Sequence, residues 1–276
     1  SFGNRFKPAG ICNPVQKTQI RHTEVFLMKF TFKKDKEKKQ RSDKTFSLLS
    51  YKTTKSQFEH SEPYRNIRTN IEFSINDKEI KTISVTSTQP SEAKSTTSIN
   101  LSIVFAHKYE RVLLIDCDLR KARLHKYLRL TNQYGLTNAV KDFSQTGEID
   151  EKYIQQVSNK NFVSKLSVIT SGKKIANPNE FLSSSTFKKF IEKLRDSYDY
   201  IIIDCPPVLS VSDAIPVGNV VDGTLFIYSC ADTKKQDAQS AINLLKQNNV
   251  YILGTILTKA NIYSGKYSYY QYGYGD

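Results

Sequence analysis

The sequence contains no tryptophan, one methionine and only four cysteines among its 276 residues. The cysteines form no C-x-x-C pair and no spacing typical of metal ligands; they are Cys12, Cys117, Cys205 and Cys230. Three of them lie within or beside strongly apolar segments, which favours reduced, buried thiols in the cytosol. A disulfide framework and a zinc site are therefore not expected.

Long hydrophobic runs are also absent. No apolar stretch approaches the roughly 18 residues that a membrane-spanning helix needs. The apolar stretch 25–28 is too short for the core of a secretory signal, and lysines follow it. With 38% hydrophobic and 25% charged residues, the chain has enough apolar surface for a sizeable core, as one large or two small domains.

Acidic residues are too few to balance the basic ones, and the formal net charge is +14. Nine of these excess positive charges lie in residues 1–60, which hold fourteen Lys and Arg but only five Asp and Glu. The densest run, residues 33–41, could bring the protein near an anionic membrane surface or a nucleic acid. We favour a solvated arm and expect no specific nucleic-acid binding.

The first 55 residues show neither helical nor strand periodicity and are rich in Lys, Thr, Ser and Gln. We therefore expect residues 1–55 to be mostly disordered. Met28 stands just before the lysine-rich run and looks like a natural start, so we expect residues 1–27 to be upstream or added sequence. Residues 56–262 are expected to form the folded domain, and residues 263–276 a flexible tail.

From about Glu62 onward, apolar residues at helical spacing predict an amphipathic helix. Its apolar positions are Tyr64, Ile67, Ile71 and Phe73. Strands are then expected over residues 82–86, 112–116, 166–169, 200–204, 225–228 and 252–257, and helices over residues 96–107, 187–196 and 235–248. Because these strands are apolar on both faces and alternate with helices, the sequence predicts an α/β fold with a parallel sheet covered by helices on both faces. Ligands bind such sheets at the carboxyl ends of the strands.

The loop after the first of these strands has features of a phosphate-binding loop. In a P-loop, backbone N–H groups surround the phosphates, a lysine reaches them, and a serine or threonine holds Mg²⁺; Lys94 and Ser95 fit these positions. The pattern G-x-x-x-x-G-K-[ST] is not met, because Thr88 and Ala93 replace its glycines. A methyl group at position 93 would crowd the phosphate or disfavour a positive-φ backbone. Taken alone, a turn with a helix cap at Ser91 explains the loop nearly as well. The residues predicted to bind nucleotide are Pro90, Ser91, Glu92, Ala93, Lys94, Ser95 and Thr96.

Acidic residues end two further strands. Asp116 and Asp118 follow one strand, and beside a P-loop they could hold Mg²⁺ and accept a proton from an attacking hydroxyl. A turn with an ion pair to Arg120 or Lys121 is the alternative. Asp204 ends another strand before two prolines, as a Walker B aspartate does. Three strand-end motifs in this chain order are more specific than any one of them. The predicted catalytic residues are Lys94, Asp116, Asp118 and Asp204, and the predicted metal ligands are Ser95, Asp116, Asp118 and Asp204.

With these motifs, residues 56–276 resemble the bacterial tyrosine kinases of capsular and exopolysaccharide synthesis, which are relatives of the MinD/ParA-like P-loop ATPases. Lys94 and Ser95 match the Walker A motif of that family, Asp116 and Asp118 its Walker A′ motif, and Asp204 its Walker B motif. The resemblance also covers the stretches 177–182 and 212–214. Its E-x-x-R-x-x-R helix, through which such kinases form rings, corresponds to Glu62, Arg65 and Arg68. The chain departs from the family pattern at Ser91, Ala93, Ala122, Thr258 and Lys259.

The C-terminal tail is rich in tyrosine, with five in its last ten residues, and its mixture with Gly, Ser and Gln predicts flexibility. It resembles the cluster that such kinases autophosphorylate. The tyrosines concerned are Tyr263, Tyr267, Tyr269, Tyr270, Tyr272 and Tyr274. Phosphates on these tails would repel one another, which would favour dissociation of a ring.

The resemblance implies an ATP- and Mg²⁺-dependent tyrosine kinase that phosphorylates itself and regulates capsular or exopolysaccharide synthesis and export. It implies a ring-shaped homo-oligomer, such as an octamer, a membrane-bound activator of the polysaccharide co-polymerase type, and a cognate tyrosine phosphatase. The kinase would be cytoplasmic and recruited to the inner face of the membrane. Two alternatives remain: a weakly active or inactive scaffold with an altered Walker A loop, and a MinD/ParA-like positioning ATPase. The tyrosine tail and the E-x-x-R-x-x-R helix speak against the second.

Overall fold

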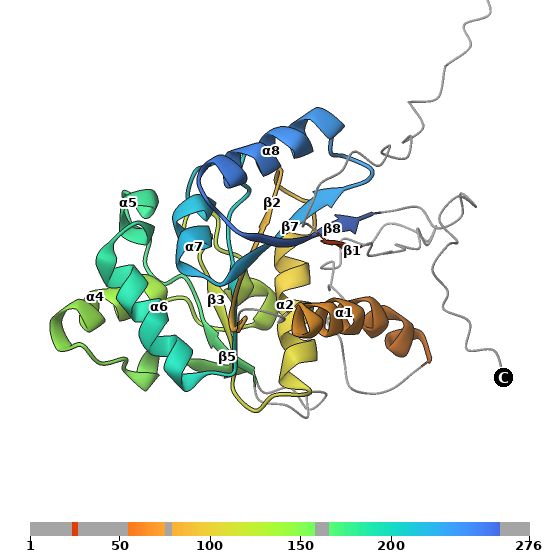
Figure 1. Ribbon diagram of the computed structural model, residues 1–276. Coiled ribbons are helices and arrows are strands. Elements are labelled where there is room, and N and C mark those ends of the chain that lie inside the picture. The colour runs from red at the N-terminus through yellow and green to blue at the C-terminus, as the bar shows by residue number, and fades with distance from the viewer. Residues whose placement is uncertain (1–23, 27–54, 75–78, 158–165, 260–276) are drawn as a thin grey trace, which may run out of the picture.

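The computed structural model describes residues 24–26, 55–74, 79–157 and 166–259, and it places eight strands of this part in one sheet (Figure 1). Their order across the sheet is β1-β8-β7-β2-β6-β3-β5-β4. The strands are β1 (Glu24–Phe26), β2 (Thr82–Ser87), β3 (Val112–Asp116), β4 (Gln155–Val157), β5 (Leu166–Ile169), β6 (Tyr200–Asp204), β7 (Gly223–Ser229) and β8 (Ile252–Thr258). All neighbours pair in parallel except β4, which runs antiparallel to β5 at one edge.

The helices are α1 (Lys55–Phe73), α2 (Lys94–Ala106), α3 (Leu124–Leu128), α4 (Leu136–Thr146), α5 (Pro178–Leu182), α6 (Ser185–Ser197), α7 (Ala214–Val220) and α8 (Lys235–Gln247), with a 3₁₀ turn η1 at Glu151–Tyr153. Within the described ranges, no helix combines the length and the apolar character that a membrane span requires.

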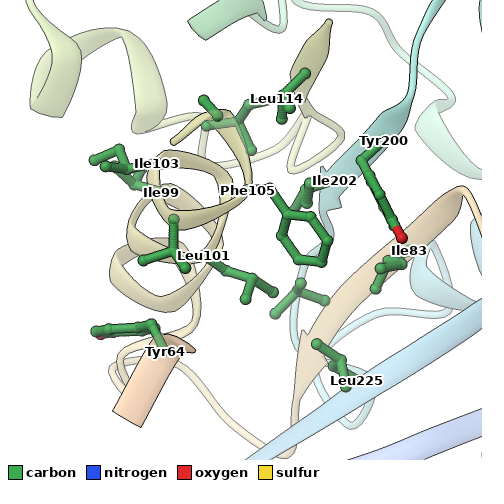
Figure 2. Packing of buried hydrophobic residues seen from close by; sticks show 14 of the residues in the cluster. Tyr64, Ile83, Ile99, Leu101, Ile103, Phe105, Leu114, Tyr200, Ile202 and Leu225 are labelled. Atoms are coloured by element: carbon green, nitrogen blue, oxygen red, sulfur yellow. The ribbon is translucent and has the colours of Figure 1, made fainter. Parts of the chain in front are cut away.

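Helices cover both faces of the sheet, as the sequence predicted, because the strands are apolar on both sides. In β3, Leu114 belongs to the cluster under α1 and α2, whereas Leu113 and Ile115 belong to the cluster under α4 and α6. Figure 2 shows the first cluster, in which Phe105 of α2 lies against Ile202 and Tyr200 of β6. Alternate side chains of each central strand therefore point to opposite helical layers.

The first helix ends at Phe73, as predicted, but differs from its prediction in two respects. It begins at Lys55 rather than near Glu62, and Phe73, expected on its apolar face, is 74% exposed. Its buried side packs on α2, which lies beside it in Figure 1, and Asn100 Nδ2 of α2 donates a hydrogen bond to the Tyr64 hydroxyl at 3.0 Å.

Three residues of the N-terminal segment, which was expected to be mostly disordered, form an edge strand. In β1, Glu24 lies opposite Gly254 of β8, and Phe26 lies opposite Ile256. The other residues up to position 54 lie outside the described part of the chain, as does the tail from residue 260 onward.

The parallel arrangement brings the carboxyl ends of β2, β6 and β3 together at one edge of the sheet. β6 lies between the other two, so that Val85 of β2 lies opposite Asp204, and Asp204 lies opposite Asp116 of β3. The loop that joins β2 to α2 runs along this edge. The three motifs recognised in the sequence therefore meet at a single place.

Candidate active site

The loop between β2 and α2 holds two residues in a backbone region that favours glycine. One of them, Ala93, stands at a missing glycine of the P-loop pattern, whereas Thr88, at the other missing glycine, has no positive φ. Ser91 has a φ of 70° and Ala93 a φ of 67°, both in the left-handed region. α2 begins at Lys94, with Ala93 as an N-cap residue that makes no side-chain capping bond. The alternative of a helix cap at Ser91 is therefore wrong. A residue with a Cβ in this conformation costs about 1–2 kcal/mol, so the loop holds strain at two positions.

Glycine at these positions is expected to relieve the strain. Ser91→Gly and Ala93→Gly should each raise the free energy of unfolding by about 1 kcal/mol and tighten nucleotide binding, measured by urea denaturation and nucleotide titration. Ala238→Gly, within α8, is the matched control and should lower the free energy of unfolding by about the same amount. Destabilisation by Ala93→Gly as large as that of the control would contradict the assigned strain.

Lys94 lies at the centre of the buried charges. Its Nζ is 2.9 Å from Asp204 Oδ1 and 3.8 Å from Asp118 Oδ2, and its side chain is only 8% exposed. Burial by itself would lower the pKa of Lys94, but the carboxylates of Asp204 and Asp118 outweigh it, so the pKa is raised above its usual value. The lysine is therefore held charged, with its ammonium group between two strand ends.

Two hydroxyl groups of α2 complete the surroundings of Asp204. Ser95 Oγ donates to Asp204 Oδ2 at 2.7 Å, and Ser98 Oγ donates to Asp204 Oδ1 at 2.9 Å. Ser98 was not among the residues predicted from the sequence. Its position four residues after Lys94, on the same face of the helix, is the signal that could have found it.

The two acids after β3 have different environments. Asp116 is fully buried and accepts hydrogen bonds from the backbone N–H groups of Asp118 (3.1 Å) and Leu124 (3.2 Å). Burial and the charge of Asp204 raise the pKa of Asp116 to about 7. Asp118 is 14% exposed in its side chain, and burial also raises its pKa. The ion pair with Arg120 or Lys121 that was the alternative explanation of these acids is not formed. The backbone N–H of Lys121 instead donates to Asp118 Oδ1 at 3.0 Å.

The pKa of Asp116 predicts how the nucleotide- and metal-free protein responds to pH. The folded-state pKa of about 7 lies above the usual value of 3.8, so the folded state holds this proton more tightly than the unfolded state. The contribution of Asp116 to stability is thus full below pH 4 and is lost as the pH rises toward 7. Asp116→Asn should flatten the decline in the free energy of unfolding over this window, measured in urea, whereas Asp196→Asn on the exposed face of α6 should not. Parallel profiles for Asp116→Asn and the unmodified protein would contradict the assigned environment.

The donor set fits a divalent cation of the magnesium type. Three carboxylates, Asp116, Asp118 and Asp204, surround the single ammonium group of Lys94, which leaves an excess of negative charge. The Ser95 hydroxyl and Asp204 Oδ2 are hard oxygen atoms only 2.7 Å apart. Among the described residues, no group of three or more His, Cys, Asp or Glu is arranged to hold a metal by itself. Mg²⁺ keeps water and phosphate oxygens as ligands and takes few from the protein.

A cavity of about 390 Å³ opens beside this cluster. Six of the seven residues predicted to bind nucleotide line it, together with Asp118 from the β3 side and residues 206–211 from the β6 side. The full lining is Ser87, Gln89, Pro90, Ser91, Ala93, Lys94, Ser95, Thr96, Asp118, Arg120, Lys121, Arg123, Tyr127, Pro206, Pro207, Ser210, Val211 and Lys259. Asp116 and Asp204 are buried and do not line it, but Asp204 accepts a hydrogen bond from Lys94, which does.

Glu92 is the predicted nucleotide-binding residue that does not line the cavity. Its side chain is buried and accepts hydrogen bonds from the backbone N–H of Gln89, at 3.0 Å, and from the hydroxyl of Thr233. The Thr258 hydroxyl donates to the Glu92 carbonyl oxygen at 3.1 Å. Glu92 therefore connects the phosphate loop to the segment that follows β7 and to the last residue of β8.

Arg120 is held at the rim of the cavity by a buried acid. Its Nε and Nη2 atoms donate to the two oxygens of Asp213, at 2.7 and 3.1 Å. Asp213 is fully buried, and this bidentate pair fixes the plane of the guanidinium. The stretch 212–214 was recognised in the sequence, but its contact with Arg120 was not.

The predicted oligomerisation residues lie on α1, away from the cavity. Arg65 is exposed and Glu62 is half-buried. Arg68 is engaged within its own subunit: its Nη1 donates to the Val104 carbonyl at 2.7 Å, and its Nε is 3.5 Å from Glu72. The six tail tyrosines lie outside the described residues.

Comparison with known proteins adds independent information. A family model described as an AAA domain matches residues 80–220. The chain is 40% identical over 215 residues to tyrosine-protein kinase YwqD of Bacillus subtilis, which covers 78% of this chain and 86% of that protein. Among solved structures, the chimerical protein CapA2B2 matches with a TM-score of 0.66 at 28% identity, covering 77% of this chain and 93% of that one. The kinase domain of Escherichia coli tyrosine kinase ETK matches with a TM-score of 0.64 at 29% identity, covering 78% and 80%.

Proposed function

The chain belongs to the bacterial tyrosine kinases, a family built on the P-loop ATPase fold, and on this basis we propose that it transfers the γ-phosphoryl group of ATP to tyrosine, including its own tail tyrosines. The observation that carries the proposal is the position of Asp118. Its carboxylate is partly exposed at the cavity and lies 3.8 Å from the ammonium group of Lys94. A proton acceptor and a phosphate-binding cation thus lie next to each other.

The two acids after β3 are assigned different tasks. Asp118 lines the cavity and takes the proton from the tyrosine hydroxyl. At the same time the tyrosine oxygen forms the new bond to the γ-phosphorus, and the bond between this phosphorus and ADP breaks. Asp116 is buried and accepts the Asp118 N–H, so it orients the turn that carries Asp118. Lys94 binds the phosphate oxygens and offsets their charge.

Ser95 and Asp204, together with Asp118, would hold Mg²⁺. When bound, Mg²⁺ supplies positive charge that stabilises the transferring phosphoryl group. Ser98 keeps Asp204 oriented through its hydrogen bond to Oδ1. Backbone N–H groups at the start of α2 bind phosphate oxygens, as the helix dipole favours.

Assembly and regulation form the finer part of the proposal. Arg65, exposed on α1, and Glu62 would contact a neighbouring subunit in a ring of the octameric type, whereas Arg68 would mainly hold α1 on α2. The ring would let the tail of one subunit reach the cavity of the next. A membrane protein of the polysaccharide co-polymerase type would activate the kinase and recruit it from the cytoplasm to the membrane, and a tyrosine phosphatase would reverse the modification. The process regulated would be capsular or exopolysaccharide synthesis and export.

A scaffold with little or no activity is the second candidate, and the phosphate loop is the observation that favours it. Ser91 and Ala93 hold positive φ angles that glycine would adopt without strain. If this strain prevents the loop from closing on phosphate, the chain would assemble without turning over ATP.

Incubation with labelled ATP, Mg²⁺ and the cytoplasmic end of an activator separates the candidates. If the chain is a tyrosine kinase, we expect phosphotyrosine on the unmodified chain. We expect this phosphotyrosine to be lost when the six tail tyrosines are replaced by phenylalanine. Release of ADP without phosphotyrosine would instead indicate a positioning ATPase. If neither product forms and the oligomer persists, the scaffold is the better description.

A further inference from the structure

Positive charge at the rim of the cavity is concentrated on the loop between β3 and α3. Arg120, Lys121 and Arg123 of this loop all line the cavity. Among the cationic side chains that line it, Lys94 is balanced by Asp204, Arg120 by Asp213 and Lys259 by Asp232 at distances of 2.9, 2.7 and 2.6 Å, respectively. Lys121 and Arg123 make no ion pair with any residue that the structure describes. Both are exposed.

These two cations lie on the same side of the cavity as the proposed proton acceptor. The backbone N–H of Lys121 donates to Asp118 Oδ1 at 3.0 Å, and also lies 3.2 Å from the Asp118 carbonyl oxygen, so one tight turn carries both residues. Arg123 immediately precedes α3, and Tyr127 of α3 reaches the cavity as well. The phosphate loop belongs to a different connection, between β2 and α2. The basic loop therefore lies beside Asp118, to which the acceptor tyrosine would give its proton.

We propose that Lys121 and Arg123, with the ring of Tyr127, form an acceptor subsite that binds a phosphorylated tyrosine next to the tyrosine being modified. This inference rests on the proposed kinase function. A phosphotyrosine carries about −1.5 to −2 charges at neutral pH, which matches two cations that have no ion-pair partner among the described residues. Binding is electrostatic, and no covalent step occurs in the subsite itself.

The sequence of the tail agrees with a preference of this kind. Its last ten residues contain five tyrosines but only one acid, Asp276, so the unmodified tail offers almost no negative charge. Tyr270 and Tyr272 are two residues apart, a span of about 6–7 Å in an extended chain. Once one of them carries phosphate, the neighbouring acceptor gains an anionic group for the subsite. Phosphorylation of the tail would then accelerate after its first event.

Two synthetic peptides test the subsite. Both have the sequence of residues 261–276 with Tyr270 as the only acceptor; the first carries phenylalanine at the other tyrosine positions, and the second differs only in having phosphotyrosine at position 272. The full chain should use the phosphorylated peptide with a kcat/KM about tenfold higher, because each of two exposed ion pairs contributes modestly. It should also bind this peptide more tightly in fluorescence anisotropy without ATP.

The variant Lys121→Gln/Arg123→Gln should reduce the ratio of kcat/KM for the phosphorylated peptide to kcat/KM for the unphosphorylated one to about two or less. Lys189→Gln/Lys193→Gln removes the same charge from the exposed face of α6 and should retain the ratio. Equal use and equal binding of the two peptides by the unmodified chain would overturn the proposal. So would a Lys121→Gln/Arg123→Gln variant that keeps the ratio and raises only the KM for ATP, because the cations would then serve the nucleotide. If the protein phosphorylates neither peptide in the presence of the cytoplasmic end of an activator, the kinase function fails, while the anisotropy comparison still decides the subsite.

Discussion

Replacing Lys94 by methionine is expected to lower tyrosine phosphorylation by at least about a thousandfold. The substitution removes the cation that would stabilise charge on the transferring phosphoryl group. It also removes the buried partner of Asp204, 2.9 Å away, and leaves the carboxylates of the site without an ammonium group. Loss of one partner of a buried ion pair costs about 3–5 kcal/mol, so Lys94→Met should also destabilise the fold, as measured by urea denaturation.

A second substitution separates these two effects. In Lys94→Met/Asp204→Asn the amide carries no charge to be compensated, and most of the lost stability should return while phosphorylation stays absent. The outcome to be compared is the free energy of unfolding of the single and double variants, without nucleotide and Mg²⁺. A double variant as unstable as Lys94→Met would show that the ion pair is not the source of the destabilisation. Recovery of activity would remove Lys94 from the catalytic machinery.

Replacing Asp118 by asparagine is expected to lower kcat by about a hundredfold to ten-thousandfold, the usual effect of losing a general base. The fold should tolerate the change, because the amide oxygen can still accept the Lys121 N–H that Asp118 Oδ1 binds at 3.0 Å. Binding of ATP should change much less than kcat, since Lys94 and the phosphate loop are unaltered. Radiolabel transfer to tyrosine gives kcat, and nucleotide titration gives affinity.

Asp213→Asn is a useful companion to Asp118→Asn, because it changes a carboxylate that holds Arg120 and does not face the cavity. If Asp118 is the proton acceptor, Asp118→Asn should lower kcat more than Asp213→Asn does. The decrease in kcat for Asp118→Asn should become smaller as the pH rises, because the tyrosine hydroxyl then ionises more readily. A kcat for Asp118→Asn within a few-fold of the unmodified chain would exclude Asp118 as the base. Asp116 would then be tested in the same way.

Much of the fold could be predicted from the sequence because the central strands are short and rich in apolar residues. The strands over residues 112–116, 166–169 and 200–204 agree with the structure to the residue. The family was predicted from the motifs at their ends, and the comparisons confirm it. Helices α3, α4, α5 and α7 were not predicted, because they are short or mix polar and apolar residues. The strand β1 was not expected, because no local pattern marks Glu24–Phe26; only its pairing with β8 makes it a strand.

The sequence by itself determined which residues carry the chemistry: a lysine after the first strand of the ATPase core, and aspartates at the ends of two buried strands. Only the tertiary structure decided which of these residues contact one another, which are buried and which line the cavity. Asp204 reaches Lys94 because β6 lies between β2 and β3 in the sheet. This strand order brings together two residues that are 110 positions apart in the chain. The same packing buries Asp116 and leaves Asp118 at the cavity, although the two are chemically identical. The sequence specifies the type of each side chain. The burial of these side chains, their pKa values and their hydrogen-bond partners arise only when strands distant in the sequence pack together.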